Sequence, residues 1–547
     1  MKSVVSIALL LLAVGNAHAA AREPVKLDEA TFRRHLAMLA SDEFEGRRPA
    51  TRAEEKTIGY LSTQFAAAGL QPGNGTEWFQ KVPLVEITAD PDIVMTFERA
   101  GQPAVPLKFG EDMVVWTKRV QPQSALEASD LVFVGYGINA PEYRWNDYAG
   151  VDMHGKTAVI LINDPGFVTR DPKLFGGRAM TYHGRWTYKY EEAMRQGAAG
   201  ALIIHDTEPA AYGWEVVVNS WGGPQLDKES VDGNARRAAI EGWITGSSAE
   251  KLFALAGQDL AALKRAATQR GFKPVPLDAR ASVAVKNAIR RSNSSNVVGI
   301  KRGSKRPDEY VIYMAHWDHL GRSLALVGDT IFNGAVDNAS GVSALITMAE
   351  QFSRARPAPE RSIVFLAVTA EEAGLLGSAY YADNPLYPLA RTAAVINMDA
   401  LPPGGPTREV SVIGFGSSQL ENYLRSAARG QDRIIKPEPT PEKGFYYRSD
   451  HFNFAKKGVP ALYIKLGIDD RVHGAAWGQA QLDDFTAKRY HKPGDEYDPQ
   501  MDFSGSLQDL ALLYEIGERI SKEKSWPNWY PGNEFRTARD RSRSKKP

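Results

Sequence analysis

The strongest constraint on the fold is an alternation of short apolar runs with helical segments in the C-terminal half. The alternation predicts an α/β fold with a mostly parallel sheet flanked by helices. In such folds, ligand sites lie at the carboxyl ends of the strands. Strand-like runs occur at 295–300, 310–315, 362–369, 393–398, 409–414 and 460–465, and helical spacing occurs at 341–353, 375–383, 418–428 and 506–522.

Two further parts of the chain are expected beside this sheet. Helical patterns at 29–39 and 53–70 belong to an N-terminal part of the same domain, which we place at 20–125. Residues 126–284 contain their own strand–strand–helix–strand unit and a further helix at 251–268. We interpret 126–284 as a smaller inserted α/β module, 285–525 as the catalytic domain, and 526–547 as an irregular, basic and solvated tail.

Residues 1–19 have the pattern of a cleavable signal peptide. Lys2 is followed by an apolar run at 4–14 and by the small-x-small site Ala17-His18-Ala19. This run is shorter than the about 20 apolar residues that span a bilayer. The pattern predicts export to the periplasm or the medium, without a membrane anchor.

The composition excludes or disfavours several classes of function. Lys and Arg number 66 against 65 Asp and Glu, so no strong overall field would attract nucleic acid or an anionic membrane. The chain has no cysteine, which excludes disulfides, thiolate metal sites and a cysteine nucleophile. A bound metal would therefore need His, Asp and Glu ligands. A serine hydrolase is disfavoured because no Gly-x-Ser-x-Gly elbow follows a predicted strand.

Residues able to bind metal follow the predicted strands. A lone His-x-Asp is usually a salt bridge, and a carboxylate before a helix is often only a cap. The strand ends of one parallel sheet meet at one edge, however, where several unpaired carboxylates would repel each other. A divalent cation resolves this, and imidazole with carboxylate suits zinc, with manganese or cobalt as alternatives. The residues are His316, Asp318, His319, Asp337, Glu371, Glu372, Asp399 and His491.

Together these motifs resemble the di-zinc exopeptidases of the bacterial leucyl aminopeptidase and glutamate carboxypeptidase type. The resemblance extends from about residue 27 to 522, and 126–284 resembles the protease-associated domain often inserted in these enzymes. It implies a zinc-exopeptidase fold of the phosphorylase/hydrolase-like kind. The matching segments are 39–47, 315–321, 334–341, 370–378, 397–399, 448–452 and 490–491.

The resemblance implies a set of metal ligands. His316 and Asp399 would hold one zinc ion, Glu372 and His491 would hold the other, and Asp337 would bridge them. His319 is expected to be structural or to support a ligand. The segment after His491 departs from the family pattern, since Lys492 stands where threonine is common and Asp495 follows three residues later.

The resemblance also implies three catalytic residues. Glu371 would be the general base and acid, taking a proton from a water activated by two zinc ions and returning it to the leaving amine. Asp318 would accept a hydrogen bond from the outer nitrogen of His316 and fix its tautomer. Tyr490 would donate to the oxyanion.

The expected function is an exported zinc aminopeptidase acting on peptides, with no nucleic-acid or membrane partner and with its oligomeric state open. Three alternatives stay open beside it. They are a carboxypeptidase or dipeptidase on the same fold, a glutaminyl cyclase relative with one zinc, and an inactive binding relative. The complete ligand set disfavours the last two.

Overall fold

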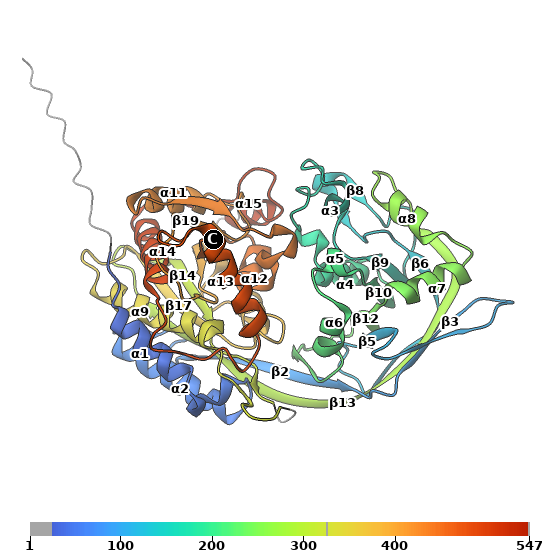
Figure 1. Cartoon of the computed structure of the whole chain (residues 1–547), viewed down its shortest axis with the longest axis horizontal. Coiled ribbons are helices and arrows are strands. Elements are labelled where there is room, and N and C mark those ends of the chain that lie inside the picture. Colours follow the sequence, from blue (N-terminus) through green and yellow to red (C-terminus); the bar gives the residue numbers. More distant parts are fainter. Residues whose placement is uncertain (1–24, 324–325, 545–547) are drawn as a thin grey trace, which may run out of the picture.

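The computed structural model describes residues 25–323 and 326–544, so the expected signal peptide at 1–19 lies outside the described residues. Figure 1 shows two lobes connected by the long strands β2 (Phe79–Ala89) and β13 (Val275–Lys301). The first lobe carries α1 (Glu29–Leu39), α2 (Arg52–Ala67) and the chain from β14 (Arg306–His316) onward. The second lobe carries the helices from α3 (Pro165–Thr169) to α8 (Leu260–Ala267). Within the described ranges, no helix is both long and apolar enough to cross a membrane.

The first lobe is built on a mixed sheet with a parallel centre. Strand β14 (Arg306–His316) lies between β17 (Arg361–Val368) and β18 (Thr392–Asn397), and both neighbours run parallel to it. Strand β21 (Ala461–Leu466) continues the parallel set beside β18. Antiparallel strands β13 and β19 (Glu409–Val412) border this centre. The predicted α/β class and each of these strand positions are confirmed.

Alternate residues of β14 pack on opposite faces of the sheet, as the two-residue period of a strand requires. Val311 and Tyr313 join one core with side chains from helices of one layer, and Ile312 and Met314 join a second core on the other face. Every residue of β17 and β18 is buried. The helices of the two layers are α1 (Glu29–Leu39), α2 (Arg52–Ala67), α9 (Ser340–Arg354), α11 (Leu420–Gly430) and α14 (Ser504–Lys522) on the first face, and α10 (Leu376–Asp383) and α12 (His451–Lys456) on the second.

The second lobe has a separate sheet and core. Its parallel strands are β6 (Gln123–Phe133), β9 (Thr157–Leu161), β10 (Gly200–Ile204) and β12 (Ile240–Ile244). The core starts at Ile93, well before the expected boundary at 126. Three early strands account for this, because β3 pairs with β13 and β5 with β12, both far along the chain, while β4 pairs with β3. They are β3 (Val94–Glu98), β4 (Val105–Lys108) and β5 (Met113–Trp116).

The helix predicted at 251–268 is in fact two helices, α7 (Gly246–Leu255) and α8 (Leu260–Ala267). Gly257 between them has a φ of 69°, which ends the first helix. Asp259 then accepts a hydrogen bond from the backbone N–H of Ala262 and caps the second.

One strand belongs to both lobes. β13 (Val275–Lys301) pairs with β6 and β3 through its first part and with β2 (Phe79–Ala89) and β17 through its second part. The lobes are therefore connected by a paired ribbon.

The prediction of a solvated, irregular tail was wrong. Trp529 is fully buried and donates from Nε1 to the carbonyl of Gly458 at 2.9 Å. Helix α15 (Arg536–Ser544) follows, and Arg539 in it is buried and donates to the carbonyl of Thr392 at 3.0 Å. The aromatic side chain of Trp529 draws this segment onto the core of the first lobe.

Candidate metal centre

The carboxyl ends of the parallel strands gather imidazoles and carboxylates at one edge of the first lobe. His316 is the last residue of β14, and Asp399 lies two residues beyond the end of β18. Glu371 and Glu372 follow β17. Asp337 lies in the turn before α9, and both His316 and Asp337 are buried. Parallel pairing aligns these ends, which explains why residues far apart in sequence meet here.

Asp337 lies between two histidines. Its Oδ1 is 3.3 Å from Nε2 of His316, and its Oδ2 is 3.3 Å from Nε2 of His491. Each imidazole nitrogen also faces a second carboxylate, Asp399 Oδ1 at 3.6 Å from His316 and Glu372 Oε2 at 3.1 Å from His491. The structure thus brings together the five residues that the sequence nominated as ligands, with Asp337 shared.

The turn that carries Asp337 depends on a glycine. Gly334 has a φ of 55°, and a Cβ placed on it would lie 2.2 Å from the carbonyl oxygen of Asp337. Buried Arg47 donates to the carbonyls of Asn333 and Gly334, at 2.7 and 3.0 Å. These two hydrogen bonds fix the backbone at the start of the turn. The peptide bond between Asp337 and Asn338 is cis.

The charges of this cluster favour a cation among the carboxylates. Burial by itself lowers the pKa of His316, but the negative charges of Glu371, Asp337 and Asp399 raise that pKa well above its usual range. Nδ1 of His316 lies 3.1 Å from the carbonyl oxygen of Asp318, which can only accept, so Nδ1 carries a proton. Nε2 then faces carboxylates alone, an arrangement that suits a divalent metal between them. This donor set of imidazole nitrogen and carboxylate oxygen fits zinc.

The two neighbouring glutamates have opposite protonation tendencies. Burial, together with Glu372, raises the pKa of Glu371 well above its usual value. Burial also acts to raise the pKa of Glu372, but His491 and His319 lower it to about 2. Paired acids whose pKa values are driven apart commonly divide the roles of proton carrier and fixed anion. Glu371 fits the first role and Glu372 the second.

Asp318 acts differently from the sequence expectation. Nδ1 of His316 is closer to the carbonyl oxygen of Asp318, at 3.1 Å, than to its carboxylate, at 3.9 Å. The carboxylate instead accepts from the backbone N–H groups of Glu371 and Glu372, at 3.0 and 3.3 Å. Asp318 therefore positions the glutamate pair by its side chain and the histidine by its backbone.

His319 contacts the cluster more closely than the sequence indicated. Its Nδ1 is 2.6 Å from Oε1 of Glu372, while its Nε2 is buried without a hydrogen-bond partner among the described residues. Its ring lies edge-on to that of His491, with centroids 5.8 Å apart. One ring nitrogen of His319 and one carboxylate oxygen each of Asp337 and Glu372 lie within 4.8 Å of one another, so these three residues could also hold one metal ion.

His491 comes from a segment with little packing. Helix α13 (Ala475–Lys488) has no buried residue. Tyr490 is 43% exposed, and its ring stacks on that of His491 with centroids 4.0 Å apart. Beyond the histidine, the buried carboxylate of Asp495 anchors the segment by accepting from the backbone N–H of Asp337 at 3.0 Å.

Two further residues on the Asp399 side were not singled out from the sequence as parts of the site. Ser449 donates to Oδ2 of Asp399 at 2.5 Å. Lys465 donates to the carbonyl oxygens of Asp399 and Ala400, at 2.5 and 3.0 Å. Ser449 lies in the segment 448–452, one of those that carry the resemblance, and Lys465 ends a predicted strand. The sequence therefore indicated where both residues lie in the fold, but not that they contact Asp399.

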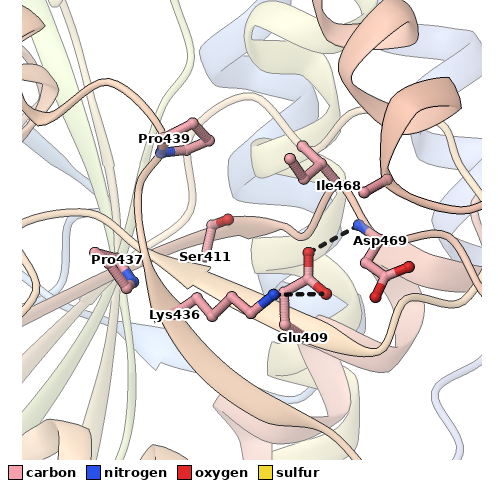
Figure 2. Close-up of a pocket in the computed structure, with 8 residues that line it drawn as sticks. Glu409, Ser411, Lys436, Pro437, Pro439, Ile468 and Asp469 are labelled. Carbon is pink, nitrogen blue, oxygen red and sulfur yellow. Dashed lines mark hydrogen bonds and ion pairs between the residues drawn. The ribbon is translucent and has the colours of Figure 1, made fainter.

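A cavity of about 220 Å³ lies beside β19 in the same lobe (Figure 2). Glu409 at its wall accepts from the backbone N–H of Asp469 at 2.7 Å. None of the metal-centre residues lines this cavity, so it is separate from the site. Its lining residues are Glu409, Ser411, Lys436, Pro437, Pro439, Ile468, Asp469 and Ala475.

Comparison with known proteins agrees with the geometry. The model of peptidase family M28 matches residues 296–514, the range that holds every metal-centre residue. This part of the chain is a peptidase family M28 domain.

Curated relatives match parts of the chain. Aminopeptidase NAALADL1 of Rattus norvegicus is 36% identical over 185 residues, 29% of this chain and 23% of that protein. Aminopeptidase YwaD of Bacillus subtilis is 26% identical over 246 residues, 44% of this chain and 48% of that protein. A probable zinc metalloprotease of Pyricularia oryzae is 36% identical over 239 residues, 41% of this chain and 46% of that protein. The match spans less than half the length of each of these relatives.

Among solved structures, the chain is similar to an aminopeptidase from Aneurinibacillus sp. strain AM-1. The two share 20% sequence identity at a TM-score of 0.49, and the alignment covers 90% of this chain and 93% of the other.

Proposed function

We propose that this chain is an exported, zinc-dependent exopeptidase that removes N-terminal residues from peptides. The observation that carries the proposal is Asp337, whose two carboxylate oxygens each lie 3.3 Å from a different histidine. Membership of the M28 domain in a peptidase family supports it, as do the names of the aminopeptidase relatives.

Two zinc ions per chain fit these residues. His316 and Asp399 would hold one ion, Glu372 and His491 the other, and Asp337 would be common to both. When bound, the ions supply Lewis acidity, which polarises the scissile carbonyl and lowers the pKa of a water towards about 7. His319 would support Glu372 through the contact at 2.6 Å.

The residues of the chain then move the proton. Glu371 takes it from the nucleophilic water and returns it to the leaving amine. Its raised pKa suits this exchange, since a proton carrier works best when its pKa lies near the working pH. Asp318 holds the backbone of Glu371 in place. Tyr490, beside His491, donates to the carbonyl oxygen as negative charge develops on it.

We further propose that the second lobe corresponds to a protease-associated domain and restricts access to the metal centre. It packs against the first lobe close to the segment that carries Ser449. The ring of Tyr182 lies 5.0 Å from that of Phe452, and Lys456 Nζ lies 2.9 Å from Glu191 Oε1. The N-terminal signal pattern supports a periplasmic or secreted location.

Hydrolysis of aminoacyl p-nitroanilides by the purified full chain tests the function, with zinc measured by elemental analysis before and after chelation. We expect cleavage that is lost with the metal and restored by zinc. N-acetylated substrates should not be cleaved, because an aminopeptidase requires the free amine. Full activity in demonstrably metal-free protein would contradict the proposal, and so would preferred cleavage of the acetylated substrates.

A further inference from the structure

The cavity of about 220 Å³ beside β19 extends from the sheet of the first lobe to the start of α13 (Figure 2). Glu409 and Ser411 of β19 form its buried wall. Both line the cavity because side chains two residues apart in a strand lie on the same face. The other lining residues come from β20 (Ile434–Pro437) and the chain after it, and from the segment between β21 and α13. They are Lys436, Pro437, Pro439, Ile468, Asp469 and Ala475.

The carboxylate of Glu409 uses only one of its two oxygens. Its Oε1 accepts from the backbone N–H of Asp469 at 2.7 Å, whereas its Oε2 is buried and has no hydrogen-bond partner among the described residues. Nζ of Lys436 lies 4.0 Å from Oε2, which is too far for a hydrogen bond. Buried polar atoms in proteins are nearly always hydrogen-bonded. Oε2 of Glu409 therefore lacks a donor, which a ligand in the cavity would supply.

Two further polar groups of the cavity are also unpaired. Within residues 25–323 and 326–544, neither Nζ of Lys436 nor the hydroxyl of Ser411 makes a hydrogen bond. Asp469 does not compete for Lys436, because its Oδ1 pairs with Nη1 of Arg408 at 3.0 Å. The cavity thus offers one negative charge and one positive charge 4.0 Å apart, with a hydroxyl that either donates or accepts.

These charges and the volume restrict the ligand. A simple cation would meet the like charge of Lys436, and a simple anion would meet that of Glu409, whereas a zwitterion matches both. An α-amino acid carries its ammonium and carboxylate groups on one carbon atom, as two charges 4.0 Å apart require. Sites for drug-sized ligands measure about 300–1,000 Å³, so this smaller cavity suits a single amino acid and not a peptide. Pro437, Pro439 and Ile468 provide apolar contacts for its side chain.

We propose that this cavity binds a free α-amino acid, whose ammonium group donates to Oε2 of Glu409 and whose carboxylate accepts from Nζ of Lys436. The site is distinct from the metal centre, none of whose residues lines the cavity. An aminopeptidase releases free amino acids, so under the proposed function the ligand is a product of the chain's own reaction. Binding itself does not depend on that function.

The position of the cavity connects it with His491. Ala475 lines the cavity and is the first residue of α13, which ends at Lys488, three residues before His491. Gly478 in the first turn lies directly against the cavity wall, since a Cβ on it would be 2.0 Å from the carbonyl oxygen of Ile468. A ligand that contacts both the sheet and this wall fastens the start of a helix that has no buried residue. Zinc on the His491 side should then bind more tightly, a coupling that rests on the proposed function.

Calorimetric titration of the zinc-loaded full chain tests the site with three probes. They are leucine, N-acetylleucine, which has no ammonium group, and leucinamide, which has no carboxylate. We expect each derivative to bind about 10- to 100-fold more weakly than leucine, the range for hydrogen bonds to charged groups. If either derivative binds as tightly as leucine, the proposal is overturned.

Variants distinguish this cavity from the metal centre, which under the proposed function also holds a released amino acid. E409Q keeps the acceptor for Asp469 but loses the negative charge, and K436M loses the positive charge. Each should weaken leucine binding by about 10- to 100-fold. D432N is the matched control and should bind leucine as the wild type does, because Asp432 precedes β20, is 98% exposed and pairs with Arg471 at 3.5 Å.

Circular dichroism verifies the fold of each variant. If E409Q does not fold, K436M decides. Leucine binding that remains unchanged in the folded variants overturns the proposal.

Zinc titration of metal-free protein measures the coupling. Saturating leucine should raise the affinity for the second zinc ion by about 5-fold or more in the wild type and D432N, but not in E409Q. Leucine binding without this change overturns the coupling. If leucine binds through Glu409 but no peptide is cleaved, the proposed function fails and the amino-acid site stands. If peptides are cleaved but leucine binding is independent of Glu409 and Lys436, the proposed function stands and the amino-acid site fails.

Discussion

His316 and His491 face the same carboxylate, Asp337, at the same distance of 3.3 Å, but the chain positions them in opposite ways. His316 ends a buried strand, and its side chain is 1% exposed. His491 follows a helix without a single buried residue, and its side chain is 38% exposed. The half of the metal centre at the sheet edge is therefore rigid before any metal arrives, whereas the other half depends on a segment that Asp495 anchors.

This difference predicts unequal metal sites. A ligand held by packing loses little conformational entropy when it binds, and a ligand on an unpacked segment loses more. We expect the ion at His316 and Asp399 to bind more tightly than the ion at Glu372 and His491. Substitutions of single ligands and of the residues that support them test this asymmetry.

Replacing Asp337, the residue common to both halves of the metal centre, should abolish the difference in zinc affinity between the two sites. In D337N the amide has lost one negative charge and presents only one acceptor oxygen, so both ions should be weakened and hydrolysis should fall to background. Zinc per chain and kcat are the measurements. Retention of two zinc ions would show that Asp337 does not bridge.

E371Q should separate catalysis from metal binding. The amide keeps the size of the side chain but cannot accept a proton, so kcat should fall by about 10²- to 10⁴-fold. Zinc should stay near two per chain, because Glu371 is not a ligand in this assignment. E372Q is the matched control and should lose zinc from the His491 side. The reverse pattern would mean that the two glutamates exchange roles.

The two histidines provide the direct comparison. H491A should leave one zinc ion per chain, held by His316, Asp337 and Asp399, and should reduce activity strongly. H319A removes the other histidine on Glu372 and should weaken the same ion less. Isothermal titration of metal-free protein with zinc measures both. If H319A loses an ion and H491A keeps two, His319 is the ligand.

Asp495 is expected to act more strongly on the weaker half than on the other. D495A removes the acceptor for the backbone N–H groups of Val336 and Asp337 and frees the segment that carries His491. Zinc affinity on that side should fall by about 10- to 100-fold, as for other residues that support a ligand. D495N keeps one acceptor oxygen and should have a smaller effect. Equal weakening of both ions would contradict the asymmetry.

The smallest effect is expected for His35, which lies in the core of the first lobe, and concerns the free energy of unfolding. Burial lowers the pKa of His35 to about 4, and its Nδ1 lies 2.6 Å from the hydroxyl of Tyr60. Below its ordinary pKa of 6.5 the unfolded chain binds a proton that the folded chain refuses. The free energy of unfolding should therefore fall by about 1.4 kcal/mol per pH unit between these values as pH decreases.

Denaturant unfolding across this pH range, followed by circular dichroism, measures the effect. H35Q should flatten the dependence. Fluorescence of the partly exposed Trp477 on α13 should not follow the same change, since that helix has no buried residue. A common pH dependence would show that the segment and the sheet unfold together.

The half of the metal centre at the sheet edge was predicted well from the sequence, for a physical reason. Buried parallel strands need continuous apolar runs, so the ends of β14, β17 and β18 could be located within a few residues, and topology then brings His316, Glu371 and Asp399 to one edge. The ligand roles themselves came from the resemblance and stay predictions.

The remaining features depend on contacts that a local pattern does not contain. Helix α13 has no apolar face, so no periodicity marks it. The start of the second lobe at Ile93 rests on pairing between β3 and the distant β13. Trp529 in the tail was a visible signal, since a large aromatic side chain in a basic segment indicates packing.

The shared strand β13 restricts how this protein can change in evolution. From Asn287 to Val297 it pairs with β2 in one unbroken register. Side chains alternate between the faces of a strand, so a single inserted residue would turn every apolar side chain beyond it from one face to the other. Insertions and deletions in this ribbon are therefore expected in multiples of two, with a matching change in β2. The distance between the lobes is accordingly expected to grow or shrink in steps of two residues.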